Sequence, residues 1–81
     1  MKMINEAKAE LIHQMVILRQ SRKITQTQLS EASGIKQPVI ARLESGKTDP
    51  QLSTVLKLLD CLDAKLILTT EGKDYNDWTR A

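Results

Sequence analysis

The 81-residue sequence contains one cysteine, one histidine, three glycines and two aromatic residues, and it has no long apolar run. Because Cys61 is alone, no disulfide can form within the chain, which suits a reducing compartment; we expect a cytoplasmic protein. Cys61 and His13 cannot supply the ligands of a usual zinc site, so we expect no metal and no cofactor. No stretch approaches the roughly 18 apolar residues that span a bilayer, and no secretory segment opens the chain, so no membrane partner is expected.

The sequence also lacks a glycine-rich phosphate-binding loop and any nucleophile with a recognisable base beside it. A chain of this size buries only about 60–65% of its unfolded surface, so its core is marginal and it has little room for a pocket. We therefore do not expect an enzyme, and we expect association with another chain.

The stretch 25–44, TQTQLSEASGIKQPVIARLE, predicts two short helices with a tight turn between them. Thr25 and Gln28 have the spacing of a capping box, and Gly34 suits a helix end that turns through positive φ. Pro38 is tolerated only in the first turn of a second helix. The inward positions are apolar: Leu29, Ala32, Ile35, Ile40 and Leu43. An ordinary helical hairpin would show the same pattern.

The outward residues at the start of the second helix favour DNA recognition over an ordinary hairpin. None of them is acidic: Lys36, Gln37, Pro38, Val39, Ala41 and Arg42. Gln and Arg can read purine edges in the major groove, and Val can contact a thymine methyl. Residues 22–47 carry five basic and two acidic side chains, whereas residues 60–81 carry three basic and five acidic ones. One end could therefore meet phosphates, although uneven charge is also common on ordinary surfaces.

Apolar spacing predicts two further helices, the first over residues 2–21 with one stripe formed by Ile4, Ala7, Leu11, Met15 and Leu18. Ile12, Val16 and Ile17 widen this stripe, either as a broad core face or as a surface for a partner. Asp49 as cap and Pro50 at the first position begin another helix that ends near residue 62 or 63. Its apolar face is expected to carry Leu52, Val55, Leu56, Leu59 and Leu62.

The segment 64–70 changes to a period of two, since Leu66 and Leu68 alternate with Lys65 and Ile67. This alternation favours a β-strand. A single strand leaves its backbone groups unpaired, so we expect it to pair with the same strand of a second copy. Residues 71–81 are polar and hold both aromatics, Tyr75 and Trp78, which are either part of a loosely held tail or anchors for a partner.

Residues 24–62 resemble the phage-repressor/Cro-type (Xre) helix-turn-helix domain, and the run KQPVIARLESGKTDPQLSTVLKLL resembles the HigA-type antitoxins of toxin–antitoxin modules. The resemblance implies a mainly all-α, lambda-repressor-like domain of four to five helices over residues 1–70, with the motif at 25–44 and a polar tail at 71–81. It implies a homodimer that binds a palindromic operator in double-stranded DNA, represses its own operon and neutralises a ribonuclease-type toxin protein. The alternative is a stand-alone phage or housekeeping repressor without a toxin.

Carried onto matching positions, the resemblance implies base reading by Gln37, Pro38, Val39, Ala41 and Arg42. It implies phosphate contacts by Thr25, Gln26, Thr27, Lys36 and Lys47. The dimer strand predicted above from the alternation, which includes Lys65, Leu66, Ile67 and Leu68, fits the layout of the family but carries none of its motifs. Arg19 and Glu44 match a partly buried ion pair that orients the second motif helix; two unrelated surface charges are the alternative.

The sequence departs from the family pattern at two positions. Lys36 stands where relatives often carry a capping Ser or Thr, a loss of about 1 kcal/mol. Ser30 replaces the usual Ala where the two motif helices cross, and it is small enough to fit there.

Overall fold

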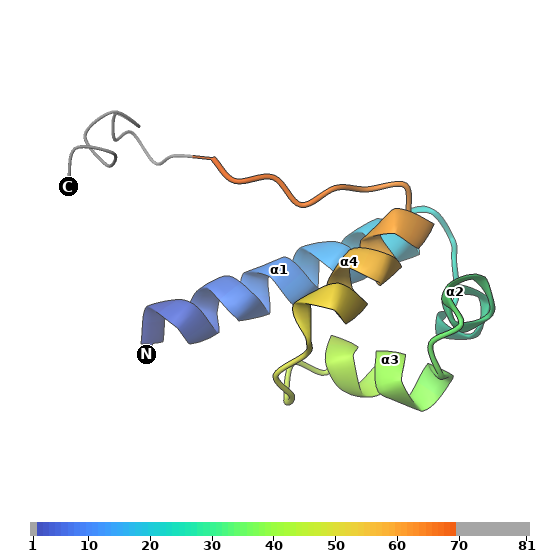
Figure 1. The fold of residues 1–81 in the computed structure, drawn as a ribbon, viewed down its shortest axis with the longest axis horizontal. Coiled ribbons are helices and arrows are strands. Elements are labelled where there is room, and N and C mark those ends of the chain that lie inside the picture. The colour runs from blue at the N-terminus through green and yellow to red at the C-terminus, as the bar shows by residue number, and fades with distance from the viewer. Residues whose placement is uncertain (1, 70–81) are drawn as a thin grey trace.

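The structure, a computed structural model, describes residues 2–69, and these residues form four helices (Figure 1). The helices are α1 (Lys2–Ser21), α2 (Gln26–Ser33), α3 (Gln37–Glu44) and α4 (Leu52–Cys61). The prediction of a mainly helical domain is therefore confirmed. Within residues 2–69, no helix combines the length and apolar character needed to cross a membrane.

One apolar core joins all four helices. α2 packs against both α3 and α4, and α3 packs against α1. The buried members of the core are Ile12, Met15, Leu29, Ile40, Leu43, Val55, Leu58, Leu59 and Leu62. Ile35, in the turn between α2 and α3, packs at the edge of this core as expected. The shared core fixes the two short helices against the longer α1.

The C-terminal ends of α1 and α4 are held together. Each helix is followed by a residue with left-handed backbone geometry, Lys23 with φ 57° after α1 and Asp63 with φ 55° after α4. These residues turn the chain sharply out of each helix, as in a Schellman motif. The guanidinium of Arg22 donates a hydrogen bond to the backbone carbonyl of Leu62. This bond ties the segment that leads into α2 to the end of α4.

The start of α4 differs from the expectation. The helix begins at Leu52 with Gln51 as its N-cap, and not at Pro50 with Asp49 as the cap. The carboxylate of Asp49 lies 3.6 Å from the ammonium group of Lys8 on α1. Asp49 therefore faces a cation on another helix, and no side chain caps α4.

The buried face of α4 is also rotated relative to the expected one. Val55 and Leu59 are buried as predicted, but Leu52 is 61% exposed and Leu56 is also exposed. Leu58, which the predicted face left out, is fully buried. Leucines surround most of this helix, so their spacing alone could not select the buried face.

On α1, the wide apolar stripe is divided between the core and the surface. Ile12 is buried, Val16 is half-buried and packs against the core, and Ile17 is half exposed. The stripe is thus in part a broad core face. Ala7 on α1 and Ala32 on α2, both expected to face inward, are exposed.

The segment 64–69 leaves the end of α4 as an extended chain (Figure 1). Across residues 2–69 it pairs with no neighbouring segment, so the expected strand does not form within a single chain. The physical reason is that a β-ladder requires a second strand to exchange hydrogen bonds. The tail 71–81, with Tyr75 and Trp78, and the last strand residue, Thr70, lie outside the described residues.

Candidate nucleic-acid interface

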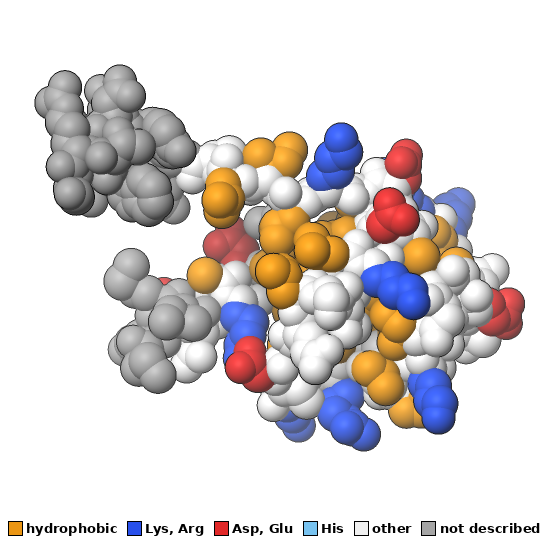
Figure 2. Space-filling model, in the orientation of Figure 1, with side chains coloured by type: hydrophobic (Ala, Val, Ile, Leu, Met, Phe, Trp, Pro, Cys, Tyr) orange, Lys and Arg blue, Asp and Glu red, His pale blue; other side chains and the backbone are white. Residues whose placement is uncertain are grey.

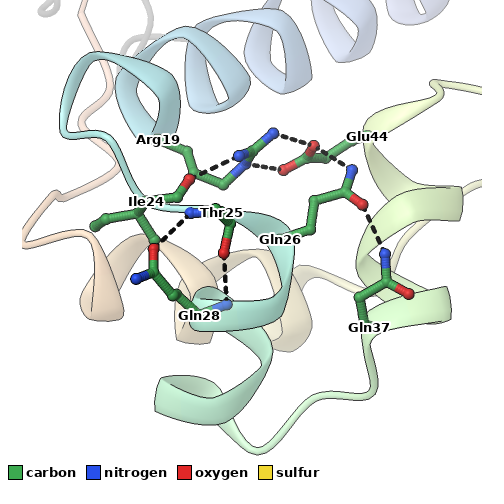
Figure 3. A network of polar contacts seen from close by, with 7 residues as sticks. All are labelled: Arg19, Ile24, Thr25, Gln26, Gln28, Gln37 and Glu44. Carbon is green, nitrogen blue, oxygen red and sulfur yellow. Dashed lines mark hydrogen bonds and ion pairs between the residues drawn. The ribbon is translucent and has the colours of Figure 1, made fainter.

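The start of α2 is fixed by a reciprocal pair of hydrogen bonds (Figure 3). The backbone N–H of Gln28 donates to the hydroxyl oxygen of Thr25 at 3.0 Å, and the backbone N–H of Thr25 donates to Oε1 of Gln28 at 2.9 Å. This is the capping box that the sequence predicted. Thr27, in the same first turn, is exposed.

One glycine and two serines set the backbone geometry of the turn between α2 and α3. Gly34 ends α2 with φ 76°, a left-handed conformation that side chains with a Cβ resist. The hydroxyl of Ser30 donates to the carbonyl of Ile35 at 2.5 Å, and the N–H of Ile35 donates to the hydroxyl oxygen of Ser33 at 3.1 Å. The sequence analysis noted only that Ser30 is small enough to fit between the helices, and it did not single out Ser33. Serines in the last turn of a helix can bond to nearby backbone groups, and this was the available signal.

α3 presents most of its expected reading residues to solvent. Lys36, Pro38, Val39 and Arg42 are exposed, whereas Gln37 and Ala41 are half-buried. The opposite face of α3 enters the core through Ile40 and Leu43. Lys36 occupies the N-cap position without a capping side-chain bond, as its replacement of Ser or Thr predicted.

Arg19 and Glu44 form a buried, two-pronged ion pair between α1 and α3. Nε of Arg19 lies 2.7 Å from Oε2 of Glu44, and a terminal guanidinium nitrogen donates to Oε1 at 2.8 Å. The other terminal nitrogen donates to the carbonyl of Ile24 at 2.7 Å. The two side chains are only 9% and 6% exposed. The pair therefore fixes α3 against the end of α1, and the two charges are not unrelated surface groups.

Two glutamines extend this ion pair to the start of α3 (Figure 3). Nε2 of Gln26 donates to Oε1 of Glu44 at 2.9 Å, and Nε2 of Gln37 donates to Oε1 of Gln26 at 2.8 Å. Sequence reasoning named all four residues of this network but did not connect the glutamines to each other or to the ion pair. The signal was weak, because Gln26 and Gln37 are eleven residues apart and meet only across the turn.

Positive charge collects where α3 lies. In Figure 2, Lys and Arg side chains gather along the lower edge of the view, which α3 occupies in Figure 1. Lys36, Arg42 and Lys47 are exposed, whereas Glu44, the acidic residue at the end of α3, is neutralised by Arg19. This surface is suited to a polyanion.

The comparison with protein families agrees with this geometry. A family model described as "Helix-turn-helix" matches residues 17–67, which include α2, the turn and α3. The chain belongs to the helix-turn-helix family. The match also covers α4, so the family extends across the core and not only across the two motif helices.

Two curated proteins similar to this chain come from bacteria. The chain is 55% identical over 49 residues to an uncharacterized HTH-type transcriptional regulator of Haemophilus influenzae, covering 60% of this chain and 50% of that protein. It is 30% identical over 66 residues to antitoxin HigA1 of Mycobacterium tuberculosis, covering 82% of this chain and 44% of that protein. The chain thus spans about half the length of the curated relatives it matches.

A solved structure is similar as well. It is described as a toxin–antitoxin module from Streptococcus pneumoniae, with a TM-score of 0.70 and 41% sequence identity over 85% of this chain and 78% of that one. Together with HigA1, it supports the resemblance of this Xre-type helix-turn-helix chain to HigA-type antitoxins.

Proposed function

We propose that this helix-turn-helix protein is a sequence-specific repressor that binds double-stranded DNA through α3. The observation that carries the proposal is the start of α3: its exposed side chains include cations and hydrogen-bonding groups, and the Arg19–Glu44 pair holds the helix in place. The base-reading residues are Gln37, Pro38, Val39, Ala41 and Arg42. Cations at the edge of this surface are attracted to phosphates irrespective of sequence, and the reading residues select among base pairs.

Phosphate contacts are assigned to Thr25, Gln26, Thr27, Lys36 and Lys47. The side chain of Gln26 is bonded inside the protein, so its contribution falls mainly to the backbone. The first N–H groups of a helix have no acceptor within that helix, and they suit a phosphate at the start of α2.

Gln37→Ala is expected to weaken operator binding by about 1–3 kcal/mol and to relax base preference at one position of each half-site. The matched control is Lys47→Ala, which should weaken all sequences alike and flatten the salt dependence by about one unit. Fluorescence anisotropy on duplexes with single base changes, repeated at several salt concentrations, measures both effects. Unchanged affinity and selectivity in Gln37→Ala would show that α3 is not the reading helix.

We further propose a homodimer with two α3 helices about 34 Å apart, so that they meet successive major grooves of a palindromic operator. The segment 64–70 is its proposed contact, as a strand paired with its copy. In the single chain, Leu66 and Ile67 are exposed and Leu68 is 98% exposed, an unfavourable state for three consecutive apolar residues. Figure 2 shows exposed apolar side chains gathered on the face in view, and Leu52 and Leu56 on α4 are among the exposed residues.

The double variant Leu66→Lys/Leu68→Lys is expected to weaken dimerisation at least about tenfold, because it places two like charges beside those of the paired strand. Thr69→Lys is the matched control, since it adds a cation to the same segment and removes no apolar side chain. Sedimentation equilibrium measures the dissociation constant of each protein. A dimer equally stable in the double variant would move the interface away from this segment.

The similarity to HigA1 and to the toxin–antitoxin module supports an antitoxin role, in which the protein neutralises a ribonuclease-type toxin and represses its own operon. Residues 1–70 would bind DNA, and the tail 71–81 with Tyr75 and Trp78 is a candidate surface for the toxin. A stand-alone repressor is the alternative, and a toxin gene beside this one would decide between them. Both roles are non-enzymatic, as the names of the relatives suggest, and both place the protein in the cytoplasm with the DNA.

A further inference from the structure

A cavity of about 250 Å³ lies between α3 and the start of α4. Val39, Arg42 and Leu43 of α3 line it, together with Thr48 and Pro50 of the loop that precedes α4. Leu43 is buried and Pro50 is half-buried, whereas Val39 and Arg42 are exposed. This α3–α4 cavity therefore combines apolar walls with an exposed cation. It also includes two of the residues assigned to base reading, so an occupant of the cavity would compete with DNA.

The charge around the α3–α4 cavity favours an occupant that carries negative charge. Residues 36–51 contain three cations, all of them exposed: Lys36, Arg42 and Lys47. They also contain two acidic residues, but Glu44 is paired with Arg19, and the carboxylate of Asp49 lies 3.6 Å from the ammonium group of Lys8. The positive charge is thus not balanced within this segment. Apolar walls beside a guanidinium also suit an aromatic ring, which can pack against both.

Residues 74–78, DYNDW, have both properties. They place two carboxylates and both aromatic side chains of the sequence within five positions, and they include no basic residue. The core that residues 2–69 form has no aromatic member, since the only two aromatics lie in this segment. The segment matches the cavity in charge and in apolar character.

The chain is long enough to bring this segment to the cavity. The cavity adjoins the first turn of α4, where Gln51 and Thr54 complete its lining, and the chain leaves α4 at the other end, after Cys61. α4 has ten residues, so the two ends are separated by roughly 15 Å along the helix axis. Residues 64–78 reach about 45–50 Å when extended. Docking by residues 74–78 uses none of the residues of the proposed strand 64–70.

We propose that residues 74–78 fold back onto the α3–α4 cavity and cover the DNA surface of the free protein. The indole of Trp78 occupies the cavity, where it packs against Val39 and stacks on the guanidinium of Arg42. The carboxylates of Asp74 and Asp77 face the cations that otherwise meet phosphates. The tail and DNA consequently compete for the same surface.

This inference rests on the proposed DNA binding and adds its regulation. The apparent affinity for DNA falls in proportion to the fraction of molecules whose α3 surface is uncovered. A tail docked in about two thirds to nine tenths of the molecules lowers the affinity roughly three- to tenfold. Release of the tail should raise the affinity by the same factor.

Trp78 is the only tryptophan of the chain, so tryptophan fluorescence reports its surroundings directly. In the parent, we expect emission at a shorter wavelength than that of free N-acetyltryptophanamide, and protection from quenching by acrylamide. Arg42→Glu replaces attraction by repulsion, so the emission should shift to longer wavelength and the protection should be lost. The matched control is Lys57→Glu, which makes the same change of charge at an exposed position of α4, next to the exposed Leu56.

Affinity for DNA is the second measurement. Duplexes are selected from a randomised library with the parent and with Tyr75→Ser/Trp78→Ser, and binding is followed by the anisotropy of labelled DNA. The double variant removes both rings without a change of charge. Its dissociation constant should be about three- to tenfold lower than that of the parent, because the tail no longer holds the cavity.

A pair of charge variants separates local contact from the general field of the protein. Asp74→Asn/Asp77→Asn should lower the dissociation constant and should also expose Trp78 in the absence of DNA. Glu6→Gln/Glu10→Gln removes the same charge from exposed positions of α1, and it should leave the fluorescence of Trp78 unchanged. Any gain in affinity in this control measures the long-range effect of charge, which the tail variant should exceed.

The inference is overturned if Trp78 in the parent is as accessible as the free model compound, or if Lys57→Glu releases it and Arg42→Glu does not. It is also overturned if Tyr75→Ser/Trp78→Ser binds DNA no more tightly than the parent. The repressor function stands in each of these cases when the parent binds its selected duplex. If neither the parent nor the double variant selects any sequence, the repressor function fails and the inference fails with it.

Discussion

Arg19→Met is expected to lower the free energy of unfolding by about 3–5 kcal/mol. The substitution leaves the carboxylate of Glu44, whose side chain is 6% exposed, without its cation. It also leaves the carbonyl of Ile24 without its donor. Native domains have a total stability of roughly 5–15 kcal/mol, so the loss would remove a large share. Urea denaturation followed by circular dichroism measures the change.

The control for this prediction is the double variant Arg19→Met/Glu44→Leu. It replaces both charges with apolar groups of similar volume, and we expect it to recover most of the lost stability because no unpaired charge remains buried. Lys8→Met breaks the exposed pair with Asp49 and should cost less than about 1 kcal/mol. A double variant as unstable as Arg19→Met would show that burial of an unpaired carboxylate is not the cause of the loss.

The buried Arg19–Glu44 pair contributes more to the geometry of the domain than to its net stability. A buried pair contributes little net stability relative to an apolar replacement, because desolvation of the charges offsets their attraction. What the Arg19–Glu44 pair supplies is geometry: its hydrogen bonds join α1, the chain before α2, and α3. A surface that must match DNA closely requires such fixed geometry.

The helix-turn-helix motif could be predicted from sequence because its signals are local. The capping box joins Thr25 to Gln28. Gly34 ends α2 through its left-handed backbone conformation, and Pro38 restricts the first turn of α3. Each signal acts within a few residues, so an isolated stretch of sequence contains the information. The ion pair came from the family resemblance and not from local spacing.

The features that the sequence did not predict depend on contacts between distant parts of the chain. Asp49 was predicted to cap α4, but the helix begins at Leu52 with Gln51 as its N-cap, and the carboxylate of Asp49 lies 3.6 Å from the ammonium group of Lys8 on α1. The orientation of α4 depended on which of several leucines meets the core, and Leu58 was missed for this reason. The bond between Gln26 and Gln37 exists only after the turn brings α2 and α3 together. The alternation in residues 64–70 predicts a strand. One chain alone cannot form the paired strand, because its partner strand belongs to a second chain.

Adjacent substitutions in α3 should separate stability from DNA binding. Ile40 is fully buried, and Ile40→Ala is expected to lower the free energy of unfolding by about 2–5 kcal/mol because it leaves a cavity in the core. Val39 is 42% exposed, so Val39→Ala should change stability by no more than about 0.5 kcal/mol. Denaturation in urea measures both values without DNA.

The same two variants should differ in the opposite sense on DNA. At a temperature where both are folded, Val39→Ala should weaken binding to the selected operator, because it removes an apolar contact available to a thymine methyl. Ile40→Ala should retain the base preferences of the parent, since its side chain faces Leu43 and the core and never reaches a base. Equal destabilisation by the two variants would mean that both side chains support the core. The face of α3 assigned to DNA would then lose Val39 as a reading residue, and recognition would depend on the other assigned residues: Gln37, Pro38, Ala41 and Arg42.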